Sequence, residues 1–143
     1  MKKKDKQWDA YKVHMRKLSE AFRYTIFAGE YDLKTQYDTD PREEESSDSP
    51  CAAQISVDHK YLLATITFYP IVYEWYKEKK FEDIARVILH EICHILTEQL
   101  YRFPLKYLND KAPDDLREIR ERQTQRITNT LFQLIKKSDY MPK

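Results

Sequence analysis

The chain has 143 residues, of which 41% are hydrophobic and 34% charged, an ordinary composition for a globular domain. Its 25 basic and 24 acidic residues give a net charge of +1, which argues against nucleic acid or an anionic membrane surface as a partner. Gly29 is the only glycine, which excludes glycine-rich phosphate-binding loops and the dinucleotide-binding fingerprint. We expect one domain over residues 1–143, with residues 1–6 as a basic flexible tail.

Two cysteines, Cys51 and Cys93, are too few for a disulfide scaffold. Lys2, Lys3 and Lys4 are followed by polar residues rather than by the apolar run of a signal peptide. No stretch approaches the roughly 18 apolar residues of a membrane span. These observations predict a cytoplasmic protein with reduced thiols and no membrane partner.

An amphipathic helix is predicted at the start of the chain. Apolar residues recur there at alternating spacings of three and four, which places them on one helical face. Gly29 is expected to end this helix. His14 flanks the stripe, and a place on the helix surface is favoured over a role as a distant metal ligand. The stripe consists of Trp8, Tyr11, Met15, Leu18, Phe22 and Ile26.

Three short segments alternate between apolar and polar residues and are predicted to be strands, over residues 31–38, 53–58 and 64–69. A polar loop over residues 39–50 follows the first of them. Because the second and third are separated by a short turn, they are expected to pair as an antiparallel hairpin. We therefore predict a small, mainly antiparallel three-stranded sheet, whose third strand could offer an unpaired edge to an extended peptide.

Helices fill the rest of the chain. A short one is predicted over residues 73–80, a buried one from about Phe81 that must end before Pro104, and a last one from about Asp114 to Lys137. This order of a leading helix, a small sheet and two long helices predicts an α+β fold. The residues expected on the buried side of the last helix are Leu116, Ile119, Ile127, Leu131, Leu134 and Ile135.

The second long helix carries the sequence His90-Glu91-Ile92-Cys93-His94. Residues four apart lie on one face of a helix, so both imidazoles can point at one metal ion. Two imidazoles, a carboxylate and an open position suit Zn²⁺, which lowers the pKa of a bound water towards about 7. Glu91 is placed to take the proton of that water as it attacks a carbonyl. The flanks are uncharged, as a water-restricted site requires.

A catalytic zinc site needs a third protein ligand, and the last helix offers Glu118 and Glu121. At about 100° per residue, Glu121 lies about 40° from Ile135 on the predicted buried side. Glu118 lies opposite Ile127 and faces solvent. Glu121 is therefore preferred, although both glutamates could instead belong to a solvent-exposed charged stretch.

With these residues in place, the chain resembles a minimal zincin metallopeptidase of the gluzincin type, in which a downstream helix supplies a glutamate. His90, Glu91 and His94 match the family motif, and residues 121–127 resemble the segment that carries the glutamate in short metallopeptidases of phages and bacteria. The His-x-x-Gly-x-x-His extension of metzincins is missing. No tyrosine or histidine can be assigned to stabilise the oxyanion.

The resemblance implies a zinc-dependent metallopeptidase that hydrolyses peptide bonds in a peptide or protein substrate. In this interpretation His90, His94 and Glu121 bind Zn²⁺, and Glu91 is the general base. The alternative is a non-catalytic binding or regulatory module, in which zinc stabilises the same fold. A nucleic-acid-associated role for the arginines of the last helix is the least favoured, because the net charge is close to zero.

Overall fold

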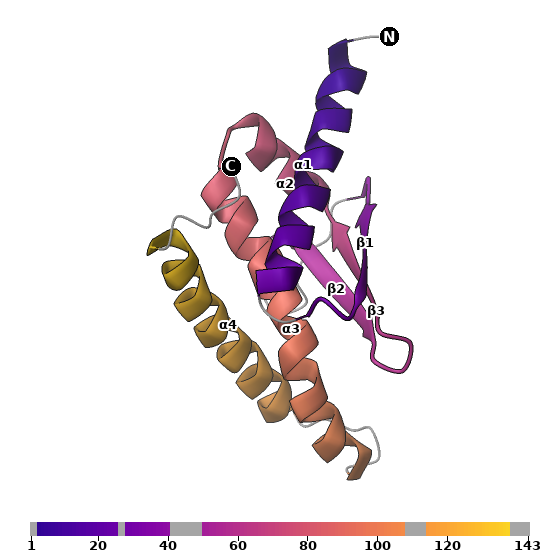
Figure 1. Ribbon diagram of the computed structural model, residues 1–143, viewed down its shortest axis with the longest axis vertical. Helices are drawn as coiled ribbons and strands as arrows, with labels where there is room; N and C mark the ends of the chain where they lie inside the picture. The colour runs from indigo at the N-terminus through magenta and orange to yellow at the C-terminus, as the bar shows by residue number, and fades with distance from the viewer. Residues whose placement is uncertain (1–2, 26–27, 41–49, 108–113, 138–143) are drawn as a thin grey trace.

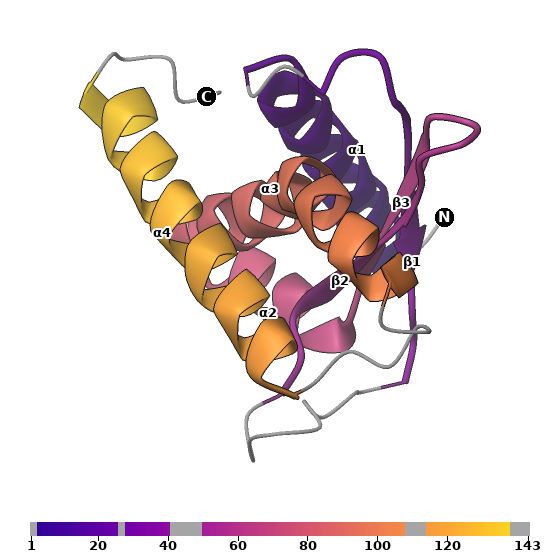
Figure 2. The ribbon, with the colours of Figure 1, turned by 90° about the horizontal axis from the view of Figure 1, so that it is seen from below.

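The computed structural model describes residues 3–25, 28–40, 50–107 and 114–137, and its long helices pack on one side of a small sheet (Figures 1 and 2). This arrangement confirms the predicted α+β class. The elements in chain order are α1 (Lys3–Thr25), β1 (Asp32–Tyr37), β2 (Ala53–Asp58), β3 (Leu63–Phe68), α2 (Pro70–Lys77), α3 (Phe81–Tyr107) and α4 (Asp114–Lys137).

The sheet has the strand order β1-β3-β2. The predicted β2–β3 hairpin is confirmed, with Ile55 opposite Ile66 in an antiparallel pair. β1 pairs in parallel with the other side of β3, so the sheet is mixed rather than mainly antiparallel. A parallel neighbour becomes possible because the long connection after β1 lets the chain cross over. β3 is consequently the central strand, and the prediction that it offers a free edge was wrong.

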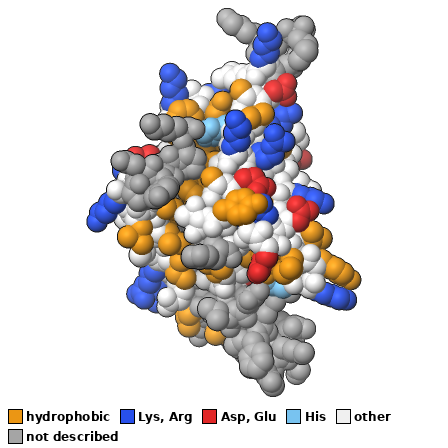
Figure 3. All heavy atoms as spheres, in the orientation of Figure 1, with side chains coloured by type: hydrophobic (Ala, Val, Ile, Leu, Met, Phe, Trp, Pro, Cys, Tyr) orange, Lys and Arg blue, Asp and Glu red, His pale blue; other side chains and the backbone are white. Residues whose placement is uncertain are grey.

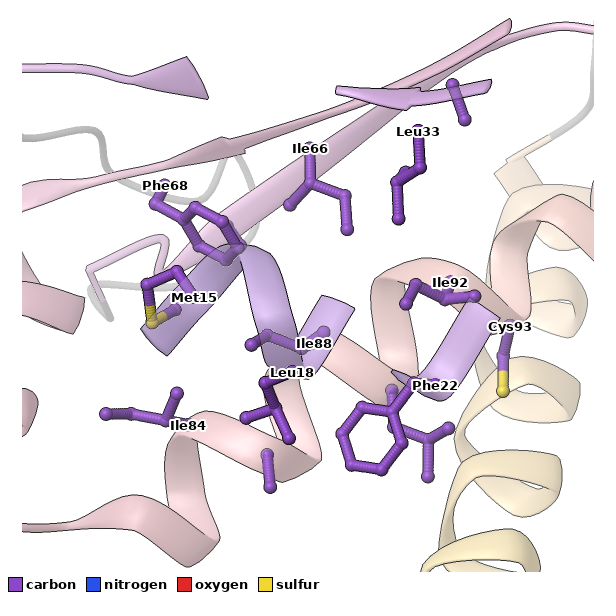
Figure 4. Close-up of a cluster of buried hydrophobic side chains, with 14 of the residues drawn as sticks. Met15, Leu18, Phe22, Leu33, Ile66, Phe68, Ile84, Ile88, Ile92 and Cys93 are labelled. Atoms are coloured by element: carbon purple, nitrogen blue, oxygen red, sulfur yellow. The ribbon is translucent and has the colours of Figure 1, made fainter. Parts of the chain in front are cut away.

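The core lies between the sheet, α1 and α3 (Figure 4). One sheet face is buried through Leu33, Ala64 and Ile66, while residues that alternate with them on β1 and β2 are exposed. Ile88 and Ile92 of α3 are completely buried beneath this face. The predicted stripe of α1 is confirmed where the structure describes it, and its buried members are Tyr11, Met15, Leu18 and Phe22.

A tight turn sets the direction in which α3 leaves α2. Lys79 has a positive φ of 59°, and the amides of Lys79 and Lys80 donate to the carbonyls of Tyr76 and Trp75. These are the two hydrogen bonds of a Schellman motif, here closed by a lysine where glycine is usual. α2 itself begins at Pro70, three residues before the predicted start, because proline suits the first turn of a helix.

Other predicted helix boundaries were also wrong. α3 continues through Pro104 to Tyr107, because a proline in the last turn removes one backbone hydrogen bond without ending the helix. α1 ends at Thr25, before Gly29, and Gly29 has no positive φ. A Cβ atom added at Gly29 would lie 3.0 Å from the Tyr24 ring. α1 already begins at Lys3, within the predicted flexible tail, since lysine is a good helix former. Parts of the predicted elements and connections lie outside the described residues, namely Ile26 and residues 41–49 and 108–113.

The buried face of α4 differs from the predicted one. Ile135 is buried and Ile127 and Leu131 are partly buried as expected, but Ile119 and Leu134 are exposed. The face that packs on α3 is instead made by Thr124, Thr128, Phe132 and Ile135. Hydrophobic periodicity missed it because two of its members are threonines, whose hydroxyls are satisfied inside the interface.

The face of α4 that packs on α3 leads to a prediction about stability. Phe132 is 1% exposed and its ring lies 4.7 Å from the Arg86 guanidinium, whereas Leu134 is 57% exposed. We expect Phe132→Ala to lower the free energy of unfolding by about 3 kcal/mol, through lost burial and an unfilled cavity. Leu134→Ala should change it by less than about 0.5 kcal/mol. Urea unfolding of both variants measures this, and equal losses would contradict the observed orientation of α4.

His14 packs under the α2–α3 turn, with its ring 5.6 Å from that of Tyr76 and 5.3 Å from that of Phe81. Burial lowers the pKa of His14 below its ordinary value. As the pH falls, the unfolded chain therefore binds a proton at His14 at a higher pH than the folded chain does. The contribution of neutral His14 to stability is fully present above the unfolded pKa and is lost as the pH falls below it. We expect His14→Gln to lose less stability than the unmodified chain between pH 7.5 and pH 5, as urea unfolding at both values would measure. An equal loss of stability in both proteins would contradict the assignment of this pH dependence to His14.

The surface carries both signs of charge. Figure 3 shows basic and acidic side chains interspersed over the face that it presents, in keeping with the net charge of +1. Among the helices in the described ranges, none combines the length and apolar character that crossing a bilayer requires.

Candidate metal centre

The two motif histidines lie one turn apart on α3, on the side that faces α4. The ring centroids of His90 and His94 are 4.8 Å apart, and the rings are nearly perpendicular. Their backbone is held by the core, because Ile88, Leu89, Ile92 and Cys93 around them are fully buried. The helix therefore presents both imidazoles from a rigid support.

Glu121 of α4 completes the group. Its Oε2 atom lies 3.5 Å from Nε2 of His90 and 3.5 Å from Nε2 of His94. One potential ligand atom from each of the three residues falls within 4.8 Å of the other two. The structure thus brings together the three residues that were predicted as metal ligands. Glu118 instead pairs with Arg122, with 2.8 Å between Nη2 and Oε1, on the exposed side of α4.

Two of the three separations fit a tetrahedral ion. Bonds of 2.0–2.2 Å to a tetrahedral Zn²⁺ place neighbouring ligand atoms about 3.4 Å apart. Both histidine–glutamate separations are 3.5 Å, and the side chain of Glu121 is 50% exposed, so solvent reaches this side of the group. Two imidazoles and one carboxylate are also the donor set of catalytic zinc sites. The residues present therefore fit the metal that the sequence motif implies.

Neighbouring groups keep the Glu121 carboxyl ionised, as a ligand must be. Hydrogen bonds with the His90 and His94 rings hold the pKa of Glu121 well below its ordinary value. Nη2 of Arg120 lies 3.2 Å from the second carboxylate oxygen, Oε1. One oxygen is thus held by the arginine while the other faces the two histidines.

Glu91 lies between this group and the edge of the sheet. Burial raises its pKa to about 7, although the neighbouring histidines oppose the shift. The Ile55 amide donates a hydrogen bond to its carboxylate. In the β2–β3 register, residues 52 and 69 share a ladder hydrogen bond, so the amide and carbonyl of Ile55 point away from β3. Glu91 therefore contacts the outer edge of β2.

Cys93, inside the motif, does not belong to the metal group. It points towards α4 (Figure 4), where Thr128 is hydrogen-bonded to it, and burial raises the pKa of its thiol to about 11. A thiol that stays protonated at neutral pH is a poor metal ligand. Neither Cys93 nor Cys51 takes part in a disulfide bond.

The remaining histidines lie elsewhere. His14 packs on aromatic rings as described above, and Nδ1 of His59 lies 2.7 Å from the Tyr31 hydroxyl at the β2–β3 turn. Neither belongs to the metal group found among the described residues. His14 was expected on the helix surface, but it is half-buried against the rings of Tyr76 and Phe81.

Sequence reasoning missed the threonines behind His94. The Thr124 hydroxyl lies 3.5 Å from Nδ1 of His94 and 2.9 Å from the hydroxyl of Thr97. All three residues are buried. Thr124 follows Glu121 by three positions on α4, and this spacing, together with the helix period, was the available clue.

Comparison of the chain with protein-family models, with curated proteins and with solved structures gives no match. Any function of the chain is therefore inferred from its own residues and their geometry.

Proposed function

We propose that this chain is a zinc-dependent metallopeptidase that hydrolyses peptide bonds. The observation that carries the proposal is the convergence of His90, His94 and Glu121 from two helices, with the Glu91 carboxylate beside them. Structural zinc sites have four protein ligands, whereas three ligands and an open position are typical of catalytic ones. A zinc ion bound there supplies Lewis acidity, which lowers the pKa of water and polarises a carbonyl.

The chain's own residues supply the proton transfers. Glu91 accepts a proton from the attacking water and later delivers it to the leaving amine, as general acid–base catalysis requires. The Ile55 amide bonds its carboxylate, and the apolar residues of α3 limit the water around it. Arg120 and the histidines hold Glu121 in its ionised form.

The outer edge of β2 is the place where an extended substrate would bind. It lies beside α3, and the carbonyl of Ile55 points outward from it. An extended peptide can pair with such an edge through its backbone, which gives affinity without demanding a particular sequence. This replaces the role that the sequence suggested for the central strand β3.

The test is hydrolysis of a diverse peptide library by zinc-loaded protein, with and without a chelator. We expect cleavage that the chelator abolishes and that added Zn²⁺ restores. Cleavage that is insensitive to the chelator would overturn the proposal. Tight zinc binding without any cleavage would favour the non-catalytic module instead, in which the ion joins α3 to α4.

A further inference from the structure

A chain of hydroxyl groups connects His94 to the backbone of its own helix. The Thr97 hydroxyl donates to the Cys93 carbonyl at 3.3 Å and lies 2.9 Å from the Thr124 hydroxyl, which in turn lies 3.5 Å from Nδ1 of His94. Thr97 and Thr124 are 1% and 0% exposed, so solvent does not compete for these bonds.

The direction of these bonds follows from counting protons. A backbone carbonyl can only accept a hydrogen bond, so the single hydroxyl proton of Thr97 is donated to the Cys93 carbonyl. The short contact between the two hydroxyls then requires Thr124 to donate to Thr97. With its own proton used, Thr124 can only accept from His94, and Nδ1 must carry the proton.

We propose that Thr124 and Thr97 form a relay that fixes a proton on Nδ1 of His94 and reserves Nε2 for a metal ion. The inference rests on the proposed zinc site, because only a bound ion gives this arrangement a function. Nε2 faces Glu121, where it can carry either a proton or a metal. A relay that holds the other ring nitrogen favours exchange of that proton for the metal.

α4 thus contacts His94 through two of its side chains. Glu121 and Thr124 lie three residues apart and share one side of the helix, with the carboxylate beside Nε2 and the hydroxyl beside Nδ1. Thr124 and Thr97 are therefore positioning residues, and neither touches the substrate.

The experiment measures zinc affinity by competition with a chromophoric chelator. We expect Thr124→Val to weaken zinc binding about 10- to 100-fold, the usual cost of losing an outer partner of a metal-bound histidine. Thr124→Ser keeps the hydroxyl and should restore affinity to within about threefold, since only a methyl group is lost. Thr128→Val is the matched control, because Thr128 is equally buried one turn further on and bonds the Thr124 carbonyl.

Nuclear magnetic resonance gives a second measure, independent of activity. In zinc-loaded protein the Nδ1 proton of His94 should exchange slowly with water, remain slow in Thr124→Ser, and exchange rapidly in Thr124→Val. Unchanged affinity in Thr124→Val, an equal loss in Thr128→Val, or a failure of serine to restore binding would each overturn the relay. Zinc binding that follows the expected series without peptide cleavage would sink only the peptidase proposal, whereas no zinc binding by the unmodified chain would sink both.

Discussion

Replacing Glu91 with glutamine is expected to lower kcat for peptide hydrolysis about 10²- to 10⁴-fold, the usual contribution of a general base. Glutamine has nearly the same shape and keeps a carbonyl oxygen that can accept from the Ile55 amide, but it cannot take a proton from water. The measurement is steady-state hydrolysis of a peptide that the unmodified protein cleaves. KM should change little, because glutamine keeps the contact with the Ile55 amide on β2, the edge along which we propose that the substrate binds.

Zinc content is the control for this variant. Glu91 is not one of the three residues whose ligand atoms converge, so Glu91→Gln should bind zinc as tightly as the unmodified chain. Lost zinc would mean that the change had disturbed the site rather than the chemistry. Hydrolysis that persisted in a zinc-loaded Glu91→Gln protein would rule Glu91 out as the base.

Replacing Glu121 with glutamine should weaken zinc binding on the order of 1,000-fold, a larger effect than the 10- to 100-fold typical of outer partners. The change removes the charged oxygen that lies 3.5 Å from both histidines and leaves a neutral amide there. Calorimetric or competitive titration with Zn²⁺ measures the loss, and hydrolysis at limiting zinc should fall with it.

Glu118→Gln is the matched control for that experiment. Glu118 lies one turn earlier on α4, with its side chain 70% exposed and paired with Arg122. The substitution makes the same chemical change at a position away from the histidines, so zinc affinity should stay within about twofold, as expected for a screened surface charge. If Glu118→Gln lost zinc and Glu121→Gln kept it, the assignment of the third ligand would be reversed.

The candidate ligands could be predicted from the sequence because they follow from local geometry. Spacing by four residues places His90 and His94 on one helical face whatever the rest of the chain does. The choice of Glu121 over Glu118 needed only the approximate direction of α4, which Ile127, Leu131 and Ile135 supplied.

Features that depend on contacts between distant segments could not be predicted. The parallel pairing of β1 with β3 is set by how a long connection crosses the sheet, which local alternation does not encode. The exact face of α4 depends on Thr124 and Thr128, which count as polar in any periodicity although both are completely buried. The Thr124 hydroxyl finds its partners, Thr97 and His94, only once α3 and α4 have come together.

The hydrogen bond between Glu91 and the Ile55 amide has a consequence for how molecules of this protein meet one another. Unpaired amides along an exposed strand invite pairing between neighbouring copies, and this leads to aggregation. Here an acid from α3 occupies one such donor on the outer side of β2. Truncating that acid to alanine would expose the amide, so the first sign of damage would be self-association at high concentration while the monomer stayed folded.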